Sequence, residues 1–238
     1  ERWDDRTRLL VGDSAVEALK QACVAVVGVG GVGAYAAEML ARSGVGSLFL
    51  VDDDALGTTN LNRHLLGLAD DVGTPKVVLM ARRIAAFNPA CEVTVRCERV
   101  SEATGRDFFP PKLDFLVDAC DVASVKAHLA QQCLSWGVAE VVATGAARRL
   151  DPTRVHLARL TDVEGDPLAA LLRRRLRKTC GSDALERIVV VASDEPPRPV
   201  PDQCKRGAPG VCGRTVLPSF CTVPAASGCA AAYAAIHH

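Results

Sequence analysis

The sequence predicts an α/β fold, with a Rossmann-like, doubly wound and mainly parallel sheet followed by a C-terminal extension of strands and helices. Two observations lead to this prediction. Short, continuously apolar segments alternate with helical segments along residues 1–146, as in parallel strands covered on both faces. The first apolar segment, 24–27, runs directly into Gly28-Val29-Gly30-Gly31-Val32-Gly33 and then a helix, which is the order of a nucleotide-binding strand, turn and helix.

The elements of the first half follow from local signals. Strands are expected at 24–27, 48–51, 92–97, 113–117 and 140–144. Helices are expected at 15–22, 33–42, 75–87 and 122–136. Asn88-Pro89 ends the third helix, because a residue before proline avoids helical geometry. We therefore predict that residues 1–146 form a Rossmann-like domain.

Beyond Gly145 the pattern changes. Further strands are expected at 155–160 and 188–192, and a loop rich in proline, glycine and charge at 194–213. Asp166 and Pro167 begin a helix, as an N-cap and a first-turn proline, that extends to Lys178. Residues 215–236 carry no charge, yet their prolines and small residues favour a buried strand and helix over a membrane span. Residues 147–238 are thus predicted to form a C-terminal extension of the same domain, which contacts the substrate and takes part in dimerisation.

The composition narrows the class of function. The chain has 238 residues, 49% of them hydrophobic, and a formal net charge of zero, so no global field draws it to nucleic acid or membrane, and we expect no DNA partner. The ten cysteines are too dilute for a disulfide scaffold, and several lie in apolar runs. This predicts a reducing compartment. We expect a cytoplasmic location, or a mitochondrial association if the chain is a piece of a longer eukaryotic protein.

The glycine-rich turn is the strongest local signal of function. Gly28, Gly30, Gly31 and Gly33 let backbone N–H groups approach phosphates, and the helix N-terminus favours their negative charge. Asp52 ends the second strand, where an acid meets ribose hydroxyls. The turn and the acid predict a nucleotide site, but alone they do not separate NAD from ATP.

Later polar residues favour ATP. Arg63 and Lys76 lie on segments after the acid and would bring positive charge to an α-phosphate under attack. Asp121 follows the fourth strand, at the sheet edge where ligands bind, and could hold Mg²⁺. Each of these residues taken singly fits a surface ion pair or a helix cap as well; their ordered combination is the more specific signal.

These motifs together carry a family resemblance. They are Gly28–Gly33, Asp52, Asn60-Leu61-Asn62-Arg63, Gly73-Thr74-Pro75-Lys76, Asn88-Pro89 and Asp118-Ala119-Cys120-Asp121. Residues 2–146 thereby resemble the adenylation domain of ubiquitin-activating-type (ThiF/MoeB-like) enzymes. The resemblance implies ATP and Mg²⁺, with Gly31 at the phosphates, Asp52 at the ribose, Arg63 and Lys76 at the α-phosphate, and Asp121 at Mg²⁺. Asp54 and Asn60 join the same site. It also implies a homodimer in which Arg8, in preference to Arg2 or Arg6, reaches the partner's ATP.

The second half is similar to one branch of that superfamily, the tRNA threonylcarbamoyladenosine dehydratases. The matching pieces are Thr144-Gly145, Asp151-Pro152-Thr153, Asp166-Pro167-Leu168-Ala169-Ala170, Ser193-Asp194-Glu195-Pro196 and Val223-Pro224 with Gly228. The resemblance implies ATP-dependent cyclisation of the threonylcarbamoyl group on the tRNA adenosine beside the anticodon. Its carboxylate is adenylated, AMP leaves, and a nitrogen or oxygen of the same modification closes the ring. Because the second step is intramolecular, proximity lowers its barrier. Some bacterial relatives carry a cysteine near Val189 or Val190, and this chain does not.

Three other interpretations stay open. An adenylyltransferase for the C-terminal glycine of a sulfur-carrier protein typically has two CxxC pairs for zinc, and this chain has none. An NAD-dependent oxidoreductase would leave Arg63, Lys76 and Asp121 unexplained. A non-catalytic scaffold would not need the complete nucleotide set. A sulfur-relay protein is a further candidate partner.

A basic run lies on the helix that Asp166 begins. Residues 146–178 carry an excess of Lys and Arg, and Arg173, Arg174 and Arg177 fall mostly opposite an apolar stripe of leucines. The alternative is an ordinary solvated helix face. Together with the resemblance, the run predicts a surface for tRNA phosphates.

Overall fold

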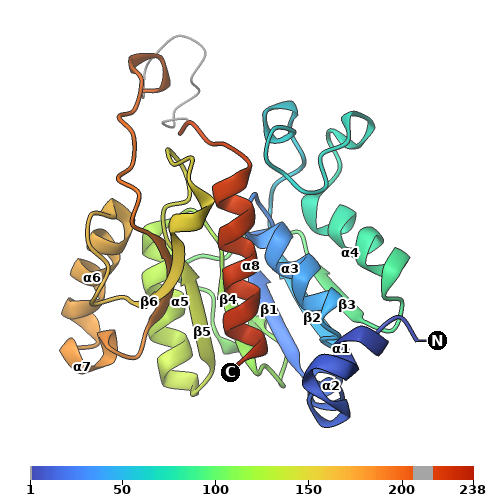
Figure 1. The fold of residues 1–238 in the computed structure, drawn as a ribbon. Helices are drawn as coiled ribbons and strands as arrows, with labels where there is room; N and C mark the ends of the chain where they lie inside the picture. Colours follow the sequence, from blue (N-terminus) through green and yellow to red (C-terminus); the bar gives the residue numbers. More distant parts are fainter. Residues whose placement is uncertain (1, 206–216) are drawn as a thin grey trace.

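The computed structural model describes residues 2–205 and 217–238. Seven strands form one sheet in the order β3-β2-β1-β4-β5-β7-β6 (Figure 1). They are β1 Cys23–Val27, β2 Ser47–Val51, β3 Glu92–Arg96, β4 Phe115–Asp118, β5 Ala139–Ala143, β6 Val155–Arg159 and β7 Val189–Ser193. β6 pairs antiparallel with β7, whereas the other neighbouring pairs are parallel. The predicted doubly wound, mainly parallel sheet is confirmed.

Helices cover both faces of the sheet. They are α1 Asp5–Val11, α2 Asp13–Gln21, α3 Gly33–Arg42, α4 Lys76–Phe87, α5 Ala123–Trp136, α6 Pro167–Thr179, α7 Ser182–Leu185 and α8 Thr222–Ile236, with short 3₁₀ turns η1 Thr58–Asn60, η2 Ala69–Asp71, η3 Arg106–Phe108, η4 Pro152–Arg154 and η5 Asp202–Cys204. α3, α4 and α8 lie on one face, and α5 and α6 on the other (Figure 1).

β1 shows how the sequence divides the core between these faces. All five of its residues are buried, as expected for a strand covered on both sides. Because side chains alternate along a strand, Val24 and Val26 join the cluster with Leu40 of α3, whereas Ala25 and Val27 join the one with Leu129 of α5.

The order of the strands places the functional site. From β1 the chain winds outward through β2 to β3, then returns to β4 on the other side of β1. The loops after β1 and β4 therefore diverge at the carboxyl edge and leave a crevice, which is where open α/β sheets bind ligands. Gly28 begins the first of these loops and Ala119 the second.

The second half of the chain completes the same sheet. β7 pairs with β5, and α8 packs against α3. A Cβ on Gly228 of α8 would lie 2.4 Å from the Val32 carbonyl oxygen, so only glycine permits this close contact. The helix predicted within 215–236 is confirmed as α8, but residues 217–221 form no strand; residues 215 and 216 lie outside the described part. Among the described residues, no helix is long and apolar enough to cross a membrane.

Candidate nucleotide-binding active site

The glycine loop is shaped by two positions that tolerate no side chain. Gly28 has φ +88°, and a Cβ there would lie 2.7 Å from the Ala119 carbonyl oxygen. A Cβ on Gly33 would lie 1.8 Å from the Gly28 carbonyl oxygen. A Cβ on Gly30, in contrast, would meet nothing within 4 Å. The loop therefore packs tightly at Gly28 and Gly33, whereas the space around Gly30 is open and a ligand can approach the backbone there.

Asp52 holds the glycine loop from the neighbouring strand. Its Oδ2 accepts a hydrogen bond from the Val29 N–H at 2.7 Å, and its Oδ1 accepts one from the Asp54 N–H at 2.8 Å. Each carboxylate oxygen keeps a second lone pair, so Asp52 can accept a ribose hydroxyl while it fixes the loop.

Two cations lie close to Asp52 and the glycine loop. The Lys76 Nζ lies 2.7 Å from Asp54 Oδ2 and 3.7 Å from Asp52 Oδ1, and its side chain is only 8% exposed. Arg63 Nη1 donates to the Thr59 carbonyl oxygen at 2.9 Å, while the Arg63 side chain packs beside Gly31. These cations are pre-positioned by acids and carbonyls, and a phosphate group could compete for their remaining N–H donors.

A cavity of about 400 Å³ joins these groups. Its walls include the predicted Gly28, Gly30, Gly31, Asp52, Asp54, Asn60, Arg63, Lys76 and Asp121, together with 143–147, Leu168, Leu217, Ser219 and Pro224. Gly33 shapes the loop without lining the cavity. Asn60 Oδ1 accepts from the Gly57 N–H at 3.0 Å, so this side chain also braces its own turn.

Asp121 is exposed at the mouth of the cavity, and no hydrogen bond or ion pair to its carboxylate occurs among the described residues. A free carboxylate at the carboxyl edge of a sheet is a suitable ligand for a hard cation. The cluster Asp52, Asp53 and Asp54 is less suitable, because Lys76 already neutralises part of its charge.

The C-terminal half contributes a wall that the sequence did not predict. Asp166 is fully buried and receives Arg149 Nη2 at 2.9 Å and the Gly145 N–H at 3.2 Å on Oδ2. Its Oδ1 accepts from the Leu168 and Ala169 N–H groups at 2.9 Å, which confirms it as the N-cap of α6. One carboxylate thus joins the start of α6 to the loop after β5 that lines the cavity.

His64 is a second residue that the sequence analysis missed. The Leu66 N–H donates to Nδ1 at 3.3 Å, so Nε2 carries the proton and donates to the Val29 carbonyl oxygen at 2.7 Å. Burial lowers the pKa of this histidine below its ordinary value of 6.5, which favours the neutral ring. His64 thereby fixes the glycine loop through the Val29 carbonyl oxygen. Its position directly after Arg63 is the sequence feature that could have indicated this role.

A buried polar group lies behind the loop after β4. Lys126 Nζ donates to Asp118 Oδ1 and to the Asp118 carbonyl oxygen, each at 3.0 Å, and both side chains are at most 1% exposed. Burial and the Asp118 charge raise the pKa of Glu140 well above its usual range, which favours the protonated carboxyl. Burial also raises the pKa of the Cys120 thiol, which therefore stays un-ionised beside the cavity.

Two predicted positions make contacts within the chain that the sequence did not predict. Arg8 belongs to α1, and this helix lies at the opposite end of the sheet from the start of α3, where the glycine loop ends (Figure 1). Its guanidinium is held by Asp4, Asp13 and Glu17 of its own chain at 2.9, 2.7 and 2.7 Å. Its contact with a partner's nucleotide stays a prediction. Arg173 Nη1 donates to the Leu160 and Val163 carbonyl oxygens at 2.7 and 2.6 Å. Arg173 therefore ties α6 to the preceding loop, whereas Arg174 and Arg177 are exposed.

Comparisons with known proteins agree with this geometry. Residues 5–233 match the ThiF family. A tRNA threonylcarbamoyladenosine dehydratase of Bacillus subtilis is 44% identical over 81% of this chain and 74% of its own. The Escherichia coli protein of that name is 38% identical over 76% of this chain and 69% of its own. A crystal structure of E. coli tRNA N6-threonylcarbamoyladenosine dehydratase in complex with ATP has a TM-score of 0.86 at 33% identity, covering 98% of this chain and 91% of that one. The chain therefore belongs to the ThiF family, in its tRNA threonylcarbamoyladenosine dehydratase branch, as the sequence motifs predicted.

Proposed function

We propose that this protein binds ATP and uses it to adenylate the carboxylate of a threonylcarbamoyl group on a tRNA adenosine beside the anticodon, so that the group closes into a ring. The observation that carries the proposal is the single cavity in which the glycine loop, Asp52, Arg63, Lys76 and Asp121 meet. The ATP complex of the E. coli relative supports the choice of nucleotide.

The reaction proceeds in two steps. A carboxylate oxygen attacks the α-phosphorus of ATP and pyrophosphate leaves, which yields a mixed anhydride of the carboxylate and AMP. A nitrogen or oxygen of the same modification then attacks the carbonyl carbon and gives up its proton, and AMP leaves with the oxygen that the carboxylate lost. Lys76 and Arg63 supply positive charge where it develops on the α-phosphate. The acceptor atom belongs to the substrate, so no enzyme nucleophile is required, in agreement with the un-ionised Cys120.

Mg²⁺ fits the free carboxylate of Asp121. The ion would be held there and would supply positive charge to the phosphate oxygens. Asp52 orients the nucleotide through the ribose, while its bond to the Val29 N–H keeps the glycine loop in place.

The direct test is turnover with a defined substrate. tRNA that carries the threonylcarbamoyl modification is incubated with the protein, ATP and Mg²⁺, and its nucleosides are analysed by mass spectrometry. We expect the modified adenosine to lose one water, with AMP and pyrophosphate formed in equal amounts. Isothermal titration should show binding of ATP with Mg²⁺ and negligible binding of NAD. Adenylation of a sulfur-carrier glycine without change in the tRNA would favour the sulfur-carrier alternative, and tight NAD binding without ATP binding the oxidoreductase.

We also propose a homodimer. α1 buries none of its residues in its own chain. Trp3, Leu9, Leu10 and Val11 on and beside this helix are 54%, 87%, 85% and 42% exposed. Grouped apolar side chains of this size on a surface are typical of a protein interface. The sulfur-relay partner stays a prediction.

A further inference from the structure

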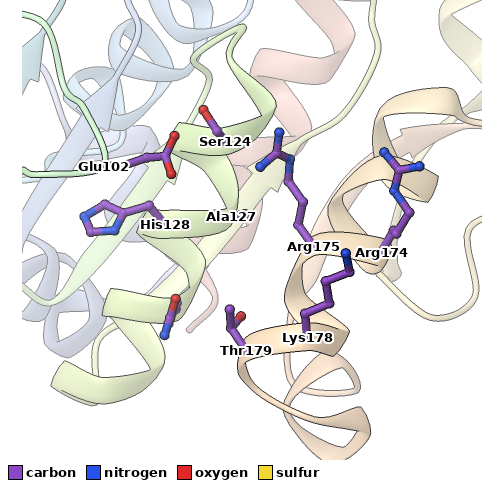
Figure 2. A pocket seen from close by; sticks show the side chains of 9 residues that line it. Glu102, Ser124, Ala127, His128, Arg174, Arg175, Lys178 and Thr179 are labelled. Carbon is purple, nitrogen blue, oxygen red and sulfur yellow. The ribbon is translucent and has the colours of Figure 1, made fainter.

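A second cavity lies between α5 and α6, outside the nucleotide pocket. It has a volume of about 470 Å³. Its wall on α6 carries three cations, Arg174, Arg175 and Lys178, and its opposite side includes Ser124 and His128 of α5. Figure 2 shows the Arg175 side chain extending from α6 toward Ser124, with Arg174 and Lys178 on the same helix. We refer to this cavity as the α5–α6 cleft.

The α5–α6 cleft is positively charged. Its three cations face one carboxylate, that of Glu102. Within the described residues, none of the three cationic head groups makes an ion pair or a hydrogen bond. The neighbouring Arg173, in contrast, uses its guanidinium on two carbonyl oxygens. The cleft cations therefore leave their donors free for an external anion.

Both helices of the cleft begin at the nucleotide pocket. Asp121 and Val125 line that pocket at the start of α5, and Leu168 lines it at the start of α6. His128, in the cleft, is three residues beyond Val125, which is roughly 5 Å along a helix. An extended ligand that places a reactive group in the pocket can thus continue directly into the cleft.

We propose that the α5–α6 cleft binds the phosphodiester backbone of the RNA whose modified base is activated in the nucleotide pocket. The inference rests on the proposed function and adds the surface along which the RNA substrate is bound. Planar guanidinium groups beside an ammonium suit phosphate oxygens, and the polar wall of Ser124 and His128 does not suit an apolar peptide. The cleft set is Arg174, Arg175 and Lys178; Arg173 and Arg177, predicted from the sequence, do not belong to it.

The test compares two double variants of equal charge. R175Q/K178Q removes two cleft cations, and R82Q/R177Q removes two exposed arginines that do not line the cleft. The full chain is titrated with tRNA carrying the threonylcarbamoyl group over a series of KCl concentrations, without ATP. Each lost phosphate contact lowers the slope of log affinity against log salt by roughly 0.7 to 0.9. We expect R175Q/K178Q to lower the slope by about 1.5 and R82Q/R177Q to leave it unchanged. R175K/K178R should restore it.

Separate measurements distinguish an effect on folding or ATP binding from an effect on tRNA binding. ATP binding and the thermal midpoint of both variants should equal those of the wild type, since the exchanged side chains lie outside the core and the nucleotide pocket. Equal slopes for the two double variants, with tRNA still bound and dehydrated, would overturn the cleft proposal alone. A wild type that binds no tRNA and dehydrates none would overturn the proposed function together with it.

Discussion

At the scale of single residues, Asp121 differs from the other acids of the pocket. Asp52 and Asp54 bind backbone N–H groups or Lys76, whereas Asp121 has no partner among the described residues. An exposed residue without such contacts contributes little to folding, and we predict that Asp121 acts on a ligand.

We therefore expect Asp121→Ala to lower the rate of AMP formation by roughly 10²- to 10³-fold, the size of effect seen when one transition-state contact is removed. The free energy of unfolding should change by less than about 0.5 kcal/mol. Initial rates of tRNA-dependent pyrophosphate release and urea unfolding measure the two quantities. Asp70→Ala, an exposed acid on η2 outside the pocket, is the matched control. Normal turnover by the Asp121 variant would remove this residue from the site.

His64 predicts a pH dependence of stability. Burial lowers its pKa in the folded protein, so the unfolded chain binds the proton first as the pH falls. Its contribution is complete above a pH of about 6.5 and declines as the pH drops toward the lowered pKa. His64→Gln should be less stable than wild type at neutral pH by about 1–3 kcal/mol, through the lost buried hydrogen bond, and this deficit should shrink in acid. Urea unfolding at several pH values measures both effects, with the exposed His156→Gln as control. A deficit that is constant with pH would show that His64 does not titrate in this way.

At the scale of elements, the start of α6 combines two functions in one carboxylate. Asp166 caps the helix through Oδ1 and holds Arg149 and the Gly145 N–H through Oδ2. We expect Asp166→Ala to cost about 3–5 kcal/mol, because it leaves the buried guanidinium of Arg149 without its partner. ATP affinity should fall too, since Gly145 lines the pocket. Chemical denaturation and calorimetric titration measure these losses, and Asp183→Ala in the exposed first turn of α7 is the control. A loss of stability with unchanged ATP affinity would show that Asp166 stabilises α6 without supporting the nucleotide site.

The same element shows what sequence patterns can and cannot predict. Asp166-Pro167 predicted the start of α6 correctly, because a cap and a first-turn proline act through local backbone geometry. The bonds from Asp166 to Gly145 and Arg149 join segments that are 21 and 17 residues away, and no local pattern encodes such distances. For Arg173 the local pattern gave a wrong prediction. A helical wheel placed it on the solvated face, but its guanidinium donates to carbonyl oxygens of the preceding loop, which a helical wheel does not represent.

The nucleotide site was predicted more completely than these contacts. Its residues follow the carboxyl ends of β1, β2 and β4, and a parallel sheet brings such ends to one edge. Leu217 and Pro224 were not predicted, because they reach the pocket only through the packing of α8 against α3.

At the scale of the whole molecule, the exposed apolar side chains of α1 predict that the protein dimerises through this helix. Leu9 is 87% exposed on a helix whose residues are all outside the core. Leu9→Asp places a charge on this apolar surface and removes no packing from the monomer. It should therefore weaken a dimer formed through α1, since an unpaired charge in an interface carries a desolvation penalty of several kcal/mol. Arg8 should matter less to a partner's chemistry than predicted, because three carboxylates of its own chain hold it.

Light scattering coupled to size-exclusion chromatography tests the assembly over a range of protein concentrations. We expect the wild type to elute as a dimer and Leu9→Asp to shift toward the monomer, with the thermal midpoint of the monomer nearly unchanged. Leu68→Asp is the matched control, because Leu68 is 68% exposed on a different surface and should leave the dimer intact. A wild type that is monomeric at all concentrations would contradict the dimer, and a Leu9 variant that stays dimeric would place the interface away from α1. A loss of dimer in both variants would point to a general effect of added acid rather than to α1.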